Sequence, residues 1–137
     1  LGLPVVAAPL DAAFRLDPAT LAAAFAEARA AGRRPILLLS NPHNPTGTVH
    51  TSDELATVAR LAREAGALVV SDEIHAPLVM PGAASTFTPW LAVADTEPDV
   101  SSTSASKGWN LAGLRAGVGV PGRAAAATIA ALKGRAG

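Results

Sequence analysis

The sequence of 137 residues contains no cysteine and no tyrosine, and its aromatic residues make up only 4% of the chain. Without cysteine, a disulfide framework and a cysteine-based metal site are both excluded. Eleven basic and 11 acidic side chains give a formal net charge of zero, so the basic excess typical of nucleic-acid binding is missing. No apolar run reaches the roughly 18 residues of a transmembrane helix. We therefore expect neither a nucleic-acid partner nor a membrane partner.

The N-terminus also lacks familiar signals. Residues 1–4 carry no basic segment and no cleavage site of a secretory signal, so we expect a cytoplasmic protein. The chain does not begin with methionine, and its single methionine is Met80. We therefore expect an internal segment of a longer protein. Half of the residues are hydrophobic and only 16% are charged, which indicates a folded chain rather than a disordered one.

Apolar runs alternate with helical patterns, as is typical of α/β layered folds. Asp17 followed by Pro18 predicts a helix start, because aspartate caps a helix and proline fits the first helical position. Thr51 with Glu54 predicts a second start, as a capping box. The expected helices span residues 17–32, 51–66 and 90–94, with a last one after Pro121. The expected strands span residues 36–39, 67–70, 99–103 and 116–120.

The strands at 36–39 and 67–70 are continuous apolar runs. Such runs suit a parallel sheet that is covered by helices on both faces, so we expect both faces of these strands to be buried. The helix between them repeats apolar residues at helical spacing, which predicts a buried stripe. This stripe consists of Leu55, Val58, Ala59 and Ala62.

Three polar clusters directly follow expected strands. They are Ser-Asn-Pro-His-Asn-Pro-Thr-Gly at 40–47, Ser-Asp-Glu-Ile-His at 71–75, and Ser-Ala-Ser-Lys at 104–107 with Arg115 downstream. In open α/β sheets, ligands bind at the carboxyl ends of the strands. The clusters are therefore the candidate functional residues. Taken singly, each also fits a turn, a helix cap or an ordinary loop.

Together and in this order, the clusters resemble the fold-type I pyridoxal-phosphate enzymes of the aminotransferase class I and II family. The resemblance covers residues 17 to about 121. It implies an α/β three-layer sandwich with a mostly parallel sheet. It also implies that residues 1–137 are the central part of the large cofactor-binding domain, without the small C-terminal domain. The full-length protein is then expected to be a homodimer that acts on a small amino-acid substrate.

The same resemblance implies that the cofactor is pyridoxal 5'-phosphate, with Lys107 as the catalytic residue. Lys107 would hold the cofactor as a Schiff base and take the substrate Cα proton. The only other lysine, Lys133, lies in an alanine-rich stretch. Asp72 matches the carboxylate that keeps the pyridine nitrogen protonated, whereas Glu73 points to the opposite side of an extended backbone. The other implied cofactor ligands are Asn44 at the ring oxygen and Ser104, Ser106 and Arg115 at the phosphate.

His75 stands where many members of the family carry tyrosine, and this chain has none. Its side chain either contacts the ring oxygen of the cofactor or packs in the protein, and the sequence leaves both open. His43 and His50 are interpreted as loop residues. No metal site is expected, because the three histidines lack ligand spacing and a third ligand type.

The segments Asp-Glu-Ile-His and Ser-Lys-Gly-Trp-Asn-Leu-Ala-Gly-Leu look like the cystathionine β-lyase subgroup (MalY/PatB type, cysteine-S-conjugate β-lyases). The implied reaction is C–S β-elimination from cystathionine or a cysteine S-conjugate, which yields a thiol, pyruvate and ammonia. An aminotransferase of the same family is the alternative, and a non-catalytic remnant is the second. Residues 1–137 alone are expected to be poorly soluble or partly ordered, and inactive.

Overall fold

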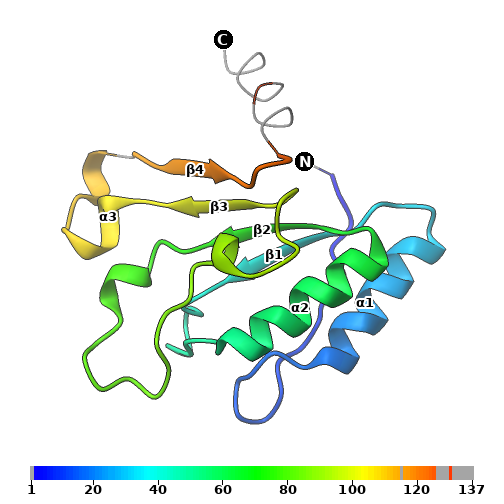
Figure 1. The fold of residues 1–137 in the computed structure, drawn as a ribbon, viewed down its shortest axis with the longest axis horizontal. Coiled ribbons are helices and arrows are strands. Elements are labelled where there is room, and N and C mark those ends of the chain that lie inside the picture. Colours follow the sequence, from blue (N-terminus) through cyan, green and yellow to red (C-terminus); the bar gives the residue numbers. More distant parts are fainter. Residues whose placement is uncertain (1, 115, 126–129, 131–137) are drawn as a thin grey trace.

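The computed structural model describes residues 2–114, 116–125 and 130, and their strands form a four-stranded sheet (Figure 1). The long helices are α1 (Pro18–Ala30) and α2 (Ser52–Ala65). The strands are β1 (Ile36–Ser40), β2 (Leu68–Asp72), β3 (Val100–Thr103) and β4 (Val118–Pro121). The short elements are α3 (Ala105–Gly108) and three 3-10 turns, η1 (Ala76–Leu78), η2 (Trp90–Ala92) and η3 (Ala112–Leu114). The two long helices and the four strands confirm the predicted ones. The helix expected at 90–94 is a 3-10 turn, and α3, η1 and η3 were not predicted. The helix expected after Pro121 falls largely outside the described residues.

Both long helices begin at the predicted caps. The Asp17 carboxylate accepts a hydrogen bond from the backbone N–H of Ala19 at 2.8 Å. Thr51 and Glu54 form the full capping box, in which each side chain accepts a hydrogen bond from the other's backbone N–H. Gly66 ends α2 in the left-handed region at φ +65°, a conformation that glycine adopts without steric cost.

The sheet has the order β1-β2-β3-β4. The first three strands run parallel, and β4 runs antiparallel to β3. Ser40 lies opposite Asp72 on the neighbouring strand, and Asp72 lies opposite Ser102. The carboxyl ends of β1, β2 and β3 therefore meet at one edge of the sheet, which is where the polar clusters begin.

The core lies between the sheet and the two long helices (Figure 1). The predicted stripe of α2 is buried as expected, and Leu55, its first residue, is 0% exposed. The buried core residues are Leu21, Phe25, Leu39, Leu55, Val58, Ala59, Ala62, Ala67, Val69 and Trp90. The α/β class with a mostly parallel sheet is thus confirmed.

Only one face of β1 is buried in the described chain, although its continuous apolar run suits a strand that is covered on both faces. Leu39 faces the helices and is 4% exposed, whereas Ile36 and Leu38 on the other face are 54% and 78% exposed. Side chains alternate along a strand, and α1 and α2 both pack on the face of Leu39. The described residues therefore supply the sheet and one helical layer of the expected three-layer sandwich.

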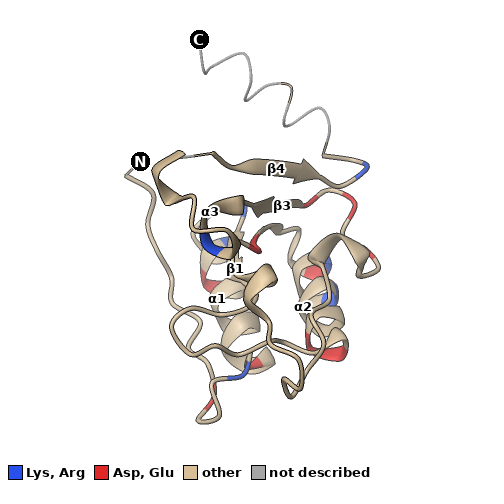
Figure 2. Cartoon of the chain, turned by 90° about the vertical axis from the view of Figure 1, so that its left-hand side faces the viewer, with Lys and Arg blue, Asp and Glu red and all other residues tan. Residues whose placement is uncertain are grey.

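The two later strands themselves carry no charged residue. Neither β3 nor β4 contains Lys, Arg, Asp or Glu, while both long helices carry charges of both signs (Figure 2). Within the described part of the chain, no helix is long and apolar enough to cross a membrane.

Candidate active site

A hollow of about 420 Å³ opens at the carboxyl ends of β2 and β3. Three of the predicted cofactor ligands line it, namely Asp72, Ser104 and Ser106. The remaining lining residues are Ile74, Ser102, Thr103 and residues 116–119. The sequence analysis missed Ser102, Thr103 and the glycines of the last segment. The unusually polar composition of strand β3 (Val-Ser-Ser-Thr) was the signal that pointed to the first two.

Asp72 is the last residue of β2 and is exposed toward this hollow. One carboxylate oxygen accepts a hydrogen bond from the backbone N–H of Ile74 at 3.0 Å. The side chain therefore stabilises the turn after the strand while it faces the site. Glu73 lies on the opposite face and is buried, as the alternation along the strand predicts.

Ser104 and Ser106 join β3 to the chain before β4. Ser104 caps α3 by accepting a hydrogen bond from the backbone N–H of Ser106 at 3.0 Å. Its hydroxyl donates to the carbonyl of Ala116 at 2.6 Å, and the two serine hydroxyls lie 2.6 Å apart. The hydroxyl pair is thus fixed at the rim of the hollow.

Lys107 lies in α3, one residue after Ser106, and its side chain is exposed. The neighbouring Gly108 packs against Pro77 of η1. A Cβ at position 108 would come within 2.7 Å of the Pro77 Cβ. Only a residue without a side chain fits there, so this contact sets where the Lys107 helix rests.

Among the described residues, the predicted ligands Asn44, His75 and Lys107 do not line the hollow. Asn44 is exposed in the loop after β1, and His75 is partly buried directly before η1. Arg115 lies outside the described residues, so its predicted contact with the phosphate stays a prediction.

The two asparagines of the loop after β1 have different environments. Asn41 is 0% exposed, and its side chain accepts a hydrogen bond from the backbone N–H of His50 and donates one to the carbonyl of Thr88. Its backbone N–H donates to the carbonyl of Asp72 at 3.0 Å. Asn41 therefore anchors the loop to β2, which leaves Asn44 free at the exposed turn.

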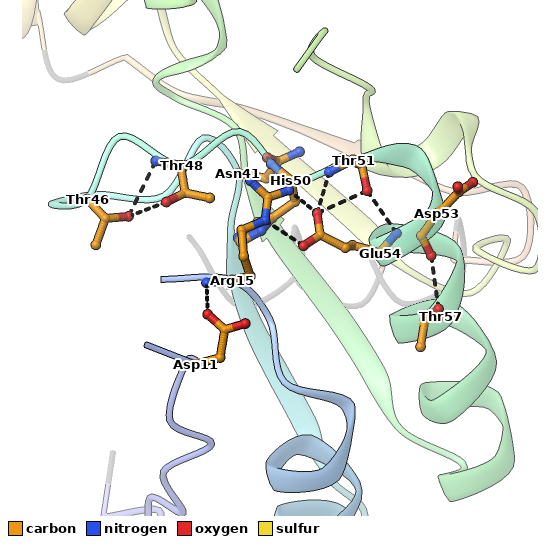
Figure 3. A network of polar contacts seen from close by, with 10 residues as sticks. All are labelled: Asp11, Arg15, Asn41, Thr46, Thr48, His50, Thr51, Asp53, Glu54 and Thr57. Atoms are coloured by element: carbon orange, nitrogen blue, oxygen red, sulfur yellow. Dashed lines mark hydrogen bonds and ion pairs between the residues drawn. The ribbon is translucent and has the colours of Figure 1, made fainter. Parts of the chain in front are cut away.

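An ion pair between Arg15 and Glu54 lies next to the end of this loop, where α2 begins (Figure 3). The Arg15 guanidinium donates to both carboxylate oxygens of Glu54, one of them at 2.6 Å from Nε. Burial acts to raise the pKa of Glu54, but hydrogen bonds from Arg15 and Thr51 outweigh it and lower the pKa to about 2. The pair ties the segment before α1 to the start of α2.

His50 lies beside this ion pair in the loop before α2, as predicted, and it is 0% exposed. Neither ring nitrogen has a hydrogen-bond partner among the described residues. Burial lowers the pKa of His50 to about 4, because a charged ring is costly away from water. The ring is therefore neutral at physiological pH and fully buried.

Comparison with known proteins identifies the family. The family model described as "Aminotransferase class I and II" matches residues 1–136, so the chain belongs to this family. A Mycobacterium leprae protein named as a candidate cystathionine beta-lyase is 50% identical over 131 residues, which cover 93% of this chain and 32% of that protein. The resemblance inferred from the motifs is confirmed.

Two solved structures show the same fold. N-succinyldiaminopimelate aminotransferase from Mycobacterium tuberculosis matches with a TM-score of 0.72 and 29% identity, over 87% of this chain and 30% of that one. A PLP-bound C–S lyase from Staphylococcus hominis matches with a TM-score of 0.67 and 28% identity, over 80% of this chain and 26% of that one. The chain thus spans 26–32% of the length of these relatives.

Acid is expected to destabilise the protein through His50. Its pKa is about 4 in the folded state against about 6.5 in the unfolded state, so between these values only the unfolded state binds the proton. The free energy of unfolding should fall as the pH drops from about 6.5 to about 4, by roughly 3 kcal/mol at most. Urea unfolding across this range measures the effect. His50→Gln cannot titrate and should lose most of this dependence, and an unchanged dependence in this variant would contradict the assignment.

Gly108→Ala is expected to push α3 away from η1, because the new Cβ would overlap Pro77. Overpacking of this kind costs about 1–3 kcal/mol in unfolding free energy. Gly113→Ala is the matched control, since a Cβ there meets no atom within 4 Å, and it should be neutral or slightly stabilising. Urea midpoints compare the two variants, and equal effects would show that the Pro77 contact is not tight.

Proposed function

We propose that the protein is a pyridoxal-phosphate-dependent C–S β-lyase that acts on cystathionine or a cysteine S-conjugate. In this proposal residues 1–137 are the central part of the large cofactor-binding domain of a cytoplasmic homodimer. The observation that carries it is the grouping of Asp72, Ser104 and Ser106 around one hollow, with Lys107 in the adjoining helix. The 50% identity to a protein named for this activity supports the choice of reaction.

The residues at this edge fit the chemical groups of pyridoxal 5'-phosphate. A carboxylate suits the pyridine nitrogen, hydroxyls suit a phosphate, and an amine suits an aldehyde. Asp72, the Ser104–Ser106 pair and Lys107 supply these groups in one region of the fold. In the proposal Asn44, His75 and Arg115 complete the set at the ring oxygen and at the phosphate.

When bound, the cofactor supplies an electron sink that weakens the Cα–H bond of an amino-acid substrate. The chain's own residues then do two things. The Asp72 carboxylate keeps a proton on the pyridine nitrogen, because an opposite charge nearby favours the protonated form. The Lys107 amine takes the proton from the substrate Cα as a general base.

An aminotransferase is the second candidate, because the same residues would serve it and the fold matches a solved aminotransferase. The two reactions differ in their products. A β-lyase breaks the Cβ–S bond and releases pyruvate, ammonia and a thiol. An aminotransferase moves the amino group to a 2-oxo acid and leaves the Cβ–S bond intact.

The experiment assays the full-length protein, loaded with pyridoxal 5'-phosphate, on cystathionine. We expect pyruvate and a thiol in equal amounts, and Lys107→Arg should abolish both. Amino transfer to a 2-oxo acid without pyruvate would overturn the lyase in favour of the aminotransferase. Bound cofactor with neither product would favour a non-catalytic remnant.

Borohydride reduction of the cofactor-loaded protein is expected to attach the cofactor permanently to Lys107. The reason is that only an amine linked to the cofactor aldehyde is trapped by reduction. Peptide mass mapping locates the label. Lys133→Arg is the matched control. It removes the only other lysine of residues 1–137, so it should be labelled like the wild type if Lys107 holds the cofactor. A label on Lys133 alone would contradict the assignment.

A further inference from the structure

Glu73 is a buried carboxylate directly beside the candidate site. It follows Asp72 but faces the helix-covered side of the sheet, where it is 7% exposed. Its Oε1 accepts hydrogen bonds from the backbone N–H of Trp90 at 2.7 Å and from the hydroxyls of Ser101 at 3.1 Å and Ser71 at 3.2 Å. One oxygen atom thus joins β2, β3 and η2.

The backbone of Glu73 connects the two parts of the site. Its N–H donates to the carbonyl of Ser102 at 2.8 Å, which extends the pairing of β2 and β3 past Asp72. Its carbonyl accepts the N–H of Ala76 at 3.0 Å, which begins η1. In η1, Pro77 is the residue that packs against Gly108, next to Lys107. The position of Glu73 therefore affects both Asp72 and the helix of Lys107.

Keeping a carboxylate at this position is costly. Burial raises the pKa of Glu73, and the hydrogen bonds from Trp90, Ser101 and Ser71 offset this only in part. No cation pairs with it among the described residues. An apolar side chain would avoid the desolvation cost of a buried acid, so the hydrogen bonds that Glu73 makes must be what this residue contributes.

Asp99 provides an internal comparison, because it is a second buried carboxylate bonded to the same tryptophan. It is 0% exposed and accepts hydrogen bonds from the Trp90 indole N–H at 3.1 Å and from the Val69 N–H at 2.9 Å. Arg63 pairs with it at 2.9 Å. Asp99 precedes β3, so it lies at the opposite end of the strand from the candidate site. The two carboxylates hold one tryptophan, but only one of them is near the site.

We infer that Glu73 is a positioning residue for the cofactor site, whose carboxylate fixes Asp72 and the Lys107 helix relative to each other through β3, η2 and η1. This role rests on the proposed cofactor function. Truncating Glu73 releases the Trp90 and Ser101 hydrogen bonds and lets the end of β2 shift. A displacement on the order of 1 Å at such a site costs up to about 100-fold.

The test uses the full-length protein and two readouts that need no turnover. The first is the dissociation constant of pyridoxal 5'-phosphate, and the second is the visible circular dichroism of the bound cofactor, which reports a fixed orientation. Glu73→Ala should raise the dissociation constant about tenfold or more and lose the dichroism. Glu73→Gln keeps an accepting oxygen and should restore both. Asp99→Asn should lower the urea midpoint, because it weakens the Arg63 pair, yet leave cofactor affinity within about twofold.

The results separate a positioning role of Glu73 from a purely structural one. If Glu73→Ala and Asp99→Asn lose stability alike and both keep wild-type affinity and dichroism, Glu73 is only structural and the inference is wrong. If Glu73→Ala does not fold, Glu73→Asp takes its place, since it keeps the charge but cannot reach the same donors, and it should weaken binding in the same way. Failure of the wild type to bind the cofactor would instead overturn the proposed function, and the positioning role with it.

Discussion

The parallel alignment of β1, β2 and β3 is the constraint on which the rest of this structure depends. It sets Ser40 opposite Asp72 and Asp72 opposite Ser102, so that three loops of different sequence leave the sheet at one edge. A slip of one residue in a strand would turn every side chain to the other face. Asp72 would then point into the helical layer, and Glu73 would face the hollow in its place. The chemistry proposed for the site therefore requires this register.

Two kinds of interaction keep the register in place. The apolar residues of α1 and α2 bury one face of the sheet, which favours a single register because only that register buries Leu39 and Val69. The buried carboxylates then fix the loops. Glu73 accepts a hydrogen bond from the backbone N–H of Trp90, and Asp99 accepts one from its indole N–H. The backbone N–H of Asn41 joins the loop after β1 to the carbonyl of Asp72. Removing one partner of a buried hydrogen bond lowers the free energy of unfolding by more than the bond itself contributes. The reason is that the remaining polar group is left buried without its hydrogen bond.

Much of this arrangement could be predicted from local sequence. The caps at Asp17 and Thr51 give the helix starts, and strands that alternate with helices imply a parallel sheet whose polar loops gather at one edge. What could not be predicted depends on contacts between residues far apart in sequence. Burial of His50, the division of roles between Asn41 and Asn44, and the Arg63–Asp99 pair all require the folded chain. Which face of β1 the two helices cover could not be predicted either, because an apolar run does not reveal it.

The proposed cofactor site is the edge of the sheet formed by Asp72, Ser104, Ser106 and Lys107. A crystal structure of the full-length protein with pyridoxal 5'-phosphate tests this most directly. We expect continuous density from the Lys107 Nζ to the cofactor, with the pyridine nitrogen at hydrogen-bond distance from Asp72 and the phosphate against Ser104. Cofactor density at another place in the fold, or an Asp72 carboxylate that faces solvent with the cofactor bound, would contradict it.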